Sequence, residues 1–511
     1  MQSQEKKILA LPGGEFFELL KKIYIYVNKE LGYKIYVLTR TEYLKPYADF
    51  IASPEQLIFI PSVLKRSPWE TIPEEIEKIR HIMSESEKLT KIPTNRILLA
   101  NERTLGRAYA RDYYYWPERK LTKRVLQDNT LAETVVMRMF KFAYETIHQY
   151  APMVCLGAPT GGLVNTVFFM VAKYCHVPYI ACNSSLVTPA RHFWSSTWGS
   201  FNTDIAKKYE EKLIQNELCT VQSLRRVEAF QQKPEAPINC QTLWIKTRQQ
   251  DNLFKVNKNI FNRFMYRAIP LMKRLHLVDP KPFFSYAVDL YRSYFLRRMQ
   301  KRFYQRFSSE VLSCLKYIYY PFHVDPEIVL NVMAPTWHNQ LNTIKMLSYN
   351  LPTGYKLLVR EHRLNVGRRS NQYLEAIRLL PGVVWIDAYD DQYKYINHAS
   401  LVVTVNGTSG FEAIQLQKPV LTLDRTFYDG LNIAKRANDY PDLGAAMLDT
   451  MTSWTVDKTY NEKIALFVDA ENEVTLSMDA APADELFCIQ NKMNESVPNL
   501  DPISLEATWI S

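Results

Sequence analysis

Long apolar runs are missing from this sequence. No uninterrupted apolar stretch approaches 18 residues, and the N-terminus lacks the order of basic, apolar and small residues that marks a secretory signal. Low-complexity runs are also absent, and 13% of the residues are aromatic, which argues against long disordered stretches. We therefore expect a globular protein that is neither secreted nor embedded in a membrane.

Metal-binding patterns are missing as well. The seven cysteines are scattered without a CxxC pair, and the chain has neither an Asp-x-Asp pair nor a histidine cluster. We expect reduced, packed cysteines of a cytoplasmic protein. We also expect catalysis without a metal ion or any other cofactor, with side chains and a helix dipole acting instead.

Charge is unevenly distributed along the 511 residues. The net charge is +10, yet residues 461–511 contain 10 acidic and 2 basic side chains. The segment from Lys255 to Arg306, here called the basic belt, has 13 Lys or Arg residues, 2 acidic residues and many aromatic ones. This composition is typical of an amphipathic helical segment on an anionic membrane surface. Two interpretations stay open beside it: a single-strand nucleic-acid site, or aromatic residues packed inward beneath solvated cations.

Short apolar stretches alternate with helical or loop stretches along the first half. Strands are expected at 8–11, 34–39, 57–60, 96–100, 153–156 and 177–181. Such alternation predicts a parallel, doubly wound sheet whose ligands collect at the carboxyl ends of the strands. Gly-containing loops follow two of these strands, at 12–15 and 157–162, but neither matches the GxGxxG dinucleotide fingerprint.

The same alternation starts again after the basic belt. Strands are expected at 316–320, 355–360, 383–386, 401–405 and 420–423, with helices around 340–349, 371–380, 392–397 and 410–416. The sequence therefore predicts an α/β protein with two Rossmann-like doubly wound domains. We expect these domains at 1–240 and 313–460, a helical basic connector at 241–312 and an acidic C-terminal tail at 461–511.

The stretch 401–428 has the order strand, tight loop, helix and strand. Its loop residues Asn406, Gly407, Thr408, Ser409 and Gly410 are small or polar, and the first turn of the helix leaves N–H groups unpaired. These donors, the helix dipole and the two hydroxyls favour a phosphate or diphosphate. An ordinary turn in which Ser or Thr caps the helix explains the loop equally well, so its context has to decide.

That context consists of four segments in a fixed order. They are YIYYPFHVDPE at 317–327, LPTGYKLLVREH at 351–362, VGRR at 366–369 and VVTVNGTSGFEAIQLQKPVLTLDRTFYD at 402–429. Together they resemble the capsule polysaccharide biosynthesis family of bacterial glycosyltransferases, related to Kdo- and sialyltransferase-like enzymes. The resemblance implies the GT-B fold of two facing Rossmann-like domains. It also implies that the N-terminal domain serves the acceptor and the C-terminal domain holds a nucleotide sugar.

The identity of the donor nucleotide stays open. Some enzymes of this kind bind a CMP-linked donor with a His-Pro pair and a Ser-Ser or Ser-Thr pair. Thr408 and Ser409 match the second pair, whereas His362 is followed by Arg363 instead of Pro. The donor substrate is therefore expected to be CMP-, UDP- or GDP-linked.

Charged residues at the same sheet edge complete the predicted site. Arg360 and His362 are expected to stabilise the leaving phosphate; the alternative is a surface ion pair of Arg360 with Glu361. Glu412 is expected to accept hydrogen bonds from ribose hydroxyls; the alternative is that it only complements the helix dipole. Arg368 and Arg369, in VGRR, are expected either to reach phosphate or to be solvated loop residues.

Further candidate site residues directly follow expected strands. His323 and Glu327, after the first strand of the second domain, are expected to contact the donor sugar or the acceptor. In the first half, Glu102 is the preferred general base because it directly follows an expected strand, with Glu15 and Asp112 as alternatives.

We therefore expect a glycosyltransferase that extends a capsule or lipopolysaccharide-type glycan. Its expected partners are a nucleotide sugar, a glycan or lipid-linked glycan acceptor and the anionic inner face of the cell membrane, and no nucleic acid. One alternative is an enzyme like the UDP-sugar 2-epimerases, which have a similar fold and loop. Another is a non-enzymatic assembly or nucleic-acid-binding protein that uses the basic belt.

Overall fold

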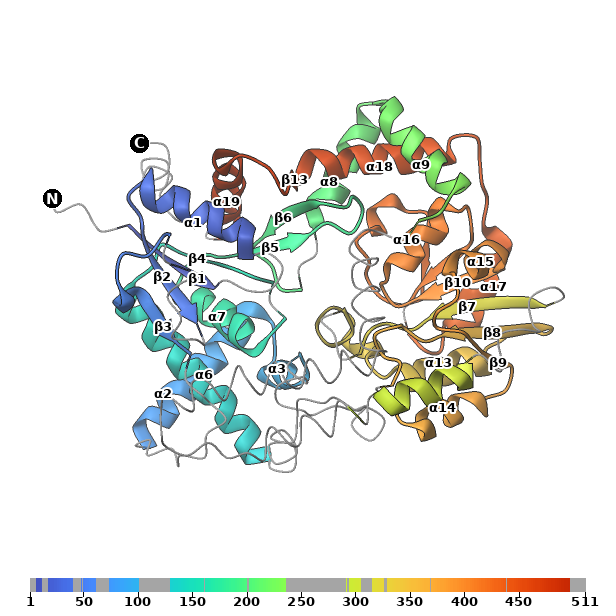
Figure 1. The fold of residues 1–511 in the computed structure, drawn as a ribbon, viewed down its shortest axis with the longest axis horizontal. Helices are drawn as coiled ribbons and strands as arrows, with labels where there is room; N and C mark the ends of the chain where they lie inside the picture. The colour runs from blue at the N-terminus through green and yellow to red at the C-terminus, as the bar shows by residue number, and fades with distance from the viewer. Residues whose placement is uncertain are drawn as a thin grey trace. The chain divides into compact units, whose positions relative to one another are not determined.

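The computed structural model describes residues 6–11, 17–39, 47, 49–60, 73–100, 129–159, 161–199, 202–235, 291, 294–304, 315–325, 329–367, 369–437 and 439–496. The chain divides into two compact units, each built around its own sheet (Figure 1). The first unit comprises Met1–Asn101, Asp128–Ile205 and Glu471–Ser511, and the second comprises Glu102–Gln127 and Ala206–Ala470.

This division differs from the domains expected from sequence. The chain enters the second unit at Ala206 rather than near residue 240, and it returns to the first unit at Glu471, inside the expected acidic tail. Of the basic belt, the structure describes Tyr291 and residues 294–304, which form a helix.

A seven-stranded sheet lies at the centre of the first unit. Its order is β13-β6-β5-β4-β1-β2-β3. The strands from β5 to β3 are parallel, whereas β6 and β13 run antiparallel at one edge. The bounds are β1 (Lys7–Leu11), β2 (Lys34–Thr39), β3 (Leu57–Phe59), β4 (Val154–Gly157), β5 (Tyr179–Ser184), β6 (Arg191–Ser195) and β13 (Leu476–Ser477).

Helices cover both faces of this sheet (Figure 1). They are α1 (Phe17–Lys29), α2 (Pro73–Thr90), α3 (Thr94–Ala100), α6 (Asn129–Tyr150), α7 (Leu163–Tyr174) and α19 (Pro482–Ser496). The prediction of a strand at 96–100 is wrong, because these residues belong to α3, which begins directly after Pro93. A short apolar run fits a buried helix as well as a strand, and here Ile97 is fully buried in a helix that packs on α6 and α7.

The acidic tail contributes to the core of the first unit. Leu486, Ile489 and Met493 of α19 pack in the same apolar cluster as residues of α1 and of β1, β2, β4 and β5. Glu485 is also buried, and its carboxylate lies 2.7 Å from Nε1 of Trp194 and 3.0 Å from Nε2 of His192. The last described part of the chain is therefore an integral layer of the first unit.

The second unit contains a six-stranded parallel sheet of order β12-β11-β10-β7-β8-β9. Its strands are β7 (Lys316–Pro321), β8 (Tyr355–Arg360), β9 (Val383–Ile386), β10 (Leu401–Thr404), β11 (Val420–Thr422) and β12 (Lys435–Arg436). The chain runs outward from β7 to β9, and then outward in the other direction from β10 to β12. This is the Rossmann order, with its switch point between β7 and β10. With two Rossmann-like units, the predicted fold class is confirmed.

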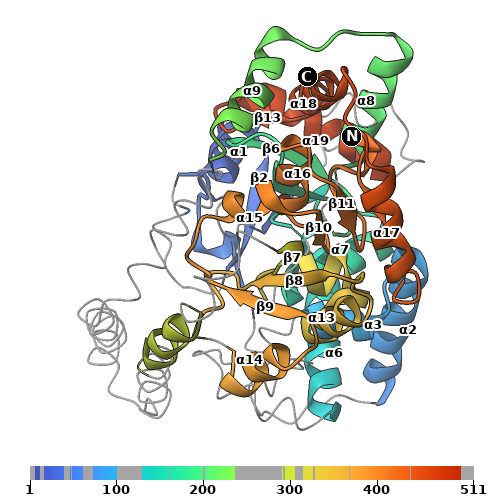
Figure 2. The same ribbon diagram turned by 90° about the vertical axis from the view of Figure 1, so that its right-hand side faces the viewer.

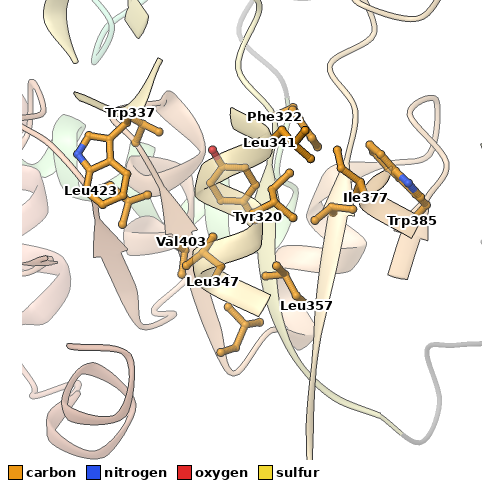
Figure 3. Packing of buried hydrophobic residues seen from close by; sticks show 14 of the residues in the cluster. Tyr320, Phe322, Trp337, Leu341, Leu347, Leu357, Ile377, Trp385, Val403 and Leu423 are labelled. Atoms are coloured by element: carbon orange, nitrogen blue, oxygen red, sulfur yellow. The ribbon is translucent and has the colours of Figure 1, made fainter. Parts of the chain in front are cut away.

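Helices complete the second unit, and its core lies between them and the sheet. They are α8 (Thr203–Ile214), α9 (Val221–Gln232), α13 (Gln340–Tyr349), α14 (Asn371–Arg378), α15 (Gln392–His398), α16 (Thr408–Gln415), α17 (Leu443–Ser453), α18 (Tyr460–Val474) and the helix at 294–304. Figure 3 shows part of the core, where Phe322 stacks on Trp385 at 5.4 Å between ring centroids. Both aromatic rings lie beside the carboxyl ends of β7 and β9, so a rigid layer supports the loops that follow these strands.

Two expectations from composition can be compared with the described residues. No helix among them is long and apolar enough to cross a membrane. The described cysteines, Cys155, Cys175, Cys182, Cys219 and Cys488, are free, which agrees with the expected reduced state.

Candidate functional site

The carboxyl ends of β7 and β10 are neighbours at the switch point of the second unit. His323 follows β7, and the loop from Val405 to Gly407 leads from β10 into α16. In a doubly wound sheet, a crevice for a ligand opens at this point because the two connecting chains leave in opposite directions. The predicted phosphate loop therefore occupies the position in this sheet at which nucleotides bind in Rossmann folds.

The loop leaves the N-terminus of α16 without a side-chain cap. Gly407 is the N-cap residue, and no side-chain hydrogen bond caps the helix, so the alternative in which Ser or Thr caps it does not hold. The N–H of Gly410 donates to the carbonyl of Gly407 at 3.2 Å. Among the described residues, the N–H groups of Thr408 and Ser409 have no backbone acceptor. Two half-buried donors at the positive end of a helix dipole are thus available to an anion.

Both glycines of the loop are required by close packing. A Cβ on Gly407 would lie 2.9 Å from Cε1 of His323, and a Cβ on Gly410 would lie 1.9 Å from the hydroxyl of Tyr428. The loop is therefore pressed against two buried rings, which hold its backbone in one place.

His323 packs against the loop and is hydrogen-bonded to it. Its Nε2 accepts a hydrogen bond from the N–H of Val405 at 3.3 Å and lies 3.3 Å from Oγ1 of Thr404. Burial lowers the pKa of His323 to about 4, so the ring is neutral at physiological pH. A neutral ring can accept at Nε2, which fits this role. Contact of His323 with a donor sugar or an acceptor stays a prediction.

Arg360 and Glu412 meet around Gln392 of α15. The carboxylate of Glu412 accepts from Nε2 of Gln392 at 2.7 Å, and Oε1 of Gln392 lies 3.4 Å from Nη1 of Arg360. Burial raises the pKa of Glu412 to about 7, although a hydrogen bond from Thr408 and the charge of Arg360 act in the opposite direction. Arg360 also donates to the carbonyls of Ala388 and Asp390, each at 3.0 Å.

Two buried polar atoms at this sheet edge, Nε of Arg360 and Oδ1 of Asn406, have no hydrogen-bond partner among the described residues. Tyr319 lies on β7 and stacks on Tyr395 of α15. Buried polar groups are nearly always hydrogen-bonded, so these two atoms are candidates for contact with a polar ligand.

A buried ionic network lies under the same sheet edge. Nε of Arg369 donates to Glu361 at 2.7 Å, and its Nη1 lies 3.4 Å from a carboxylate oxygen of Asp325. Burial raises the pKa of both carboxyls, and the charge of Arg369 opposes that shift. The guanidinium also lies over the ring of Phe322 at 4.9 Å. Arg369 is fully buried, so the expectation of a solvated or phosphate-reaching arginine is wrong, and so is the surface pair of Arg360 with Glu361.

Arg363, which stands where a proline was expected, lies in the turn after β8 and has a structural role there. Nδ1 of His362 accepts from the N–H of Leu364 at 3.2 Å, which fixes the turn. Arg363 donates to the carbonyls of Ala388 at 3.1 Å and Tyr389 at 2.9 Å. Arg363 therefore anchors the loop after β9, and a catalytic role for His362 stays a prediction.

Some predicted site residues cannot be placed. Glu102 and Glu327 lie outside the described residues, as do Glu15 and Asp112. The reason for choosing Glu102 no longer holds, since residues 94–100 form a helix. Two further residues near the site, Tyr319 and Gln392, were not predicted from the sequence. Tyr319 reads as an ordinary strand residue in KYIYYP, and the one signal for Gln392 is its place directly after Asp391, which caps α15.

Comparison with known proteins gives one family match. Residues 296–444 match the family model described as capsule polysaccharide biosynthesis protein. No curated protein matches the chain. Similar solved structures include the beta Kdo 2,7 transferase of Thermosulfurimonas dismutans KpsC, with 11% identity, a TM-score of 0.31 and coverage of 71% of this chain and 96% of that one.

Two other solved structures are similar over different lengths. The beta Kdo 2,4 transferase of the same KpsC has 14% identity, a TM-score of 0.32 and coverage of 62% and 79%. A glycosyltransferase from Rickettsia africae ESF-5 has 10% identity, a TM-score of 0.30 and coverage of 98% and 100%. At such low identities and TM-scores, these likenesses carry no argument about activity. The segment that matches the capsule polysaccharide biosynthesis family, residues 296–444, includes Arg360, the α16 loop and Glu412.

Proposed function

We propose that this protein is a glycosyltransferase that moves a sugar from a nucleotide-linked donor to a growing capsule or lipopolysaccharide-type glycan. The observation that carries the proposal is the uncapped N-terminus of α16 at the switch point of the second unit. The family match over 296–444 supports a role in capsule polysaccharide synthesis.

The chemistry follows from the charges that develop during transfer. Breaking a glycosyl–phosphate bond leaves negative charge on the nucleotide, which preorganised donors stabilise. In this proposal the N–H groups of Thr408 and Ser409, together with the hydroxyl of Ser409, donate hydrogen bonds to the phosphate oxygens. The unpartnered Nε of Arg360 lies in the same buried group and adds a positive charge at the edge of that site.

Glu412 suits the ribose of the donor. Its carboxylate is held by Gln392, and the buried side chain of Tyr319 lies near both Glu412 and Arg360. Ribose hydroxyls can donate to the carboxylate and accept from the phenol. The donor is CMP-, UDP- or GDP-linked, and the reaction is proposed to need no divalent ion. The acceptor is proposed to be a glycan or lipid-linked glycan at the inner face of the cell membrane.

Nucleotide binding tests the site. We expect CMP, UDP or GDP to bind the wild type, and Ser409→Ala and Glu412→Gln each to raise the Kd about tenfold, because each removes one polar partner of the nucleotide. Isothermal titration calorimetry measures this directly. Glu375→Gln, in an exposed pair on α14, is the control and should bind as the wild type does. Equal affinity in all four proteins would remove the assignment.

Product analysis tests the reaction. The protein is incubated with candidate nucleotide sugars, with and without a glycan acceptor and with and without a chelator. Transfer that requires the acceptor and survives the chelator is expected. Epimerisation of the sugar without an acceptor would contradict the transferase proposal and favour the epimerase alternative.

A further inference from the structure

The helix at 294–304 is fixed to the second unit by one of its faces. Gln300 accepts from the N–H of Gly367 at 2.8 Å and donates to the carbonyl of Arg369 at 2.7 Å. Tyr304 is fully buried, and its ring lies 5.4 Å from that of Trp385. Because these contacts determine the rotation of the helix about its axis, its opposite face is determined as well.

That opposite face carries apolar and cationic side chains together. Phe295 is 58% exposed and Met299 is 55% exposed, and Arg298 and Arg302 are also exposed. Their spacing of three and four residues puts them in a single row along the helix. We call this row the exposed stripe. Figure 2 shows the helix at the margin of the second unit, at the lower left of the view.

We propose that the exposed stripe docks on an anionic membrane surface. Phe295 and Met299 enter the boundary between headgroups and acyl chains, while Arg298 and Arg302 bind lipid phosphates beside them. A single helical row can meet a flat bilayer along its whole length.

Charge complementarity selects this partner. Residues 294–304 include four cationic side chains and no acidic one, and the basic belt around them has 13 cationic and 2 acidic side chains. A second apolar cluster of the unit, formed by Ile214, Leu218 and Val221 at the turn between α8 and α9, is more exposed. There, however, α8 has three cations and three acidic residues, so that cluster has no net attraction to anionic lipid.

The inference deepens the proposal that the acceptor lies at the inner face of the cell membrane and rests on that proposal, but it does not rest on the transferase activity. Gln300 ties the helix to the loop at 367–369, and Arg369 of that loop binds Glu361 at the carboxyl end of β8. Docking by the exposed stripe would thus place the proposed donor site at a fixed height above the lipid.

Vesicle binding tests the proposal with the full chain. Vesicles of phosphatidylcholine, with or without the anionic lipid phosphatidylglycerol, are pelleted with the wild type and four double variants. Arg298→Gln/Arg302→Gln should weaken binding to the anionic vesicles about 25-fold, at roughly fivefold for each arginine. Phe295→Ser/Met299→Ser should weaken it about tenfold or more. Added salt should weaken binding of the wild type and should act less on the arginine variant.

The matched control is Arg378→Gln/Leu379→Ser, which removes one exposed cation and one exposed apolar side chain at the end of α14. It should bind as the wild type does. Thermal unfolding of each variant tests whether the fold is intact, and nucleotide titration tests whether the donor site is intact. Loss of membrane binding is thereby distinguished from loss of nucleotide binding. Wild-type binding to anionic vesicles by both stripe variants would overturn the proposal. So would a loss confined to an anionic polysaccharide or a single-stranded oligonucleotide, or a loss seen instead in Leu218→Ser/Val221→Ser.

Discussion

At the scale of single residues, two buried titratable side chains lie next to the α16 loop, and their pKa values shift in opposite directions. The pKa of His323 falls to about 4, and that of Glu412 rises to about 7, in both cases because burial disfavours the charged form. Between about pH 4.5 and 6.5 the folded protein binds fewer protons at His323, but more at Glu412, than the unfolded chain does. The two effects on stability have opposite signs, so substitution is needed to separate them.

Glu412→Gln isolates the carboxyl. Its folded pKa lies above the unfolded value, so ionisation destabilises the fold progressively from about pH 4.5 to about pH 7. We expect the wild type to lose stability relative to the variant by an amount on the order of 3 kcal/mol over this interval. Urea unfolding at several pH values measures it, with Glu375→Gln as an exposed control. A difference that grows in the opposite direction, or does not change with pH, would contradict the assigned protonation.

The residues of the site differ in how far sequence could identify them. Asn406 to Gly410 were identifiable because their chemistry is local: a strand, small residues and a helix start follow one another. Tyr319 and Gln392 were not, since each acts through partners far away in sequence. Gln392 and Glu412, for example, are 20 residues apart and meet only because α15 and α16 start at the same sheet edge.

At the scale of elements, the strands of the second half could be predicted well because each is a short β-branched or aromatic run between turn residues. The helix α3 was mistaken for a strand because a run of five apolar or partly apolar residues carries no period. The edge strands β6 and β13 were missed for a different reason. They pair with each other although Leu476 and His192 are separated by more than half of the chain, and no local pattern encodes that pairing.

The loop between β8 and α14 depends on the buried arginine. Arg369→Met would leave Glu361 and Asp325 buried without a cation, so we expect a loss of about 3–5 kcal/mol at pH 7. The loss should be smaller at pH 5, where the carboxyls, whose pKa values burial already raises, become protonated more readily. Chemical unfolding of the second unit measures both values.

Arg378→Met provides the comparison for that experiment. Arg378 forms an exposed pair with Glu375 at 2.6 Å, and such pairs contribute about 0–1 kcal/mol. Equal effects of the two substitutions would show that the Arg369 network does not hold the loop.

At the scale of the whole molecule, the structure assigns the acidic tail from Glu471 onward to the first unit. Composition indicated only its charge, because the apolar residues of α19 are spaced on one helical face and are few. Ile489→Ala should cost about 2–5 kcal/mol in the first unit, since Ile489 is fully buried. Phe487→Ala, on the exposed side of the same helix, should change stability by less than about 0.5 kcal/mol.

Scanning calorimetry with and without nucleotide shows which of the two units loses stability in Ile489→Ala. Nucleotide raises the unfolding temperature of the unit that binds it. We expect Ile489→Ala to lower a transition that nucleotide does not shift. If it lowers the nucleotide-shifted transition instead, the tail does not belong to the first unit alone.

The central claim is that the N-terminus of α16 binds the phosphate of a nucleotide sugar, and Ser409→Asp tests it most directly. A carboxylate in the first turn complements the helix dipole, so the fold should keep or gain about 0.3–1 kcal/mol of stability. The same charge repels a phosphate, so the affinity for CMP, UDP or GDP should fall more than about tenfold. Titration calorimetry and thermal unfolding of the same sample give both values. Nucleotide bound by Ser409→Asp as tightly as by the wild type would contradict the account.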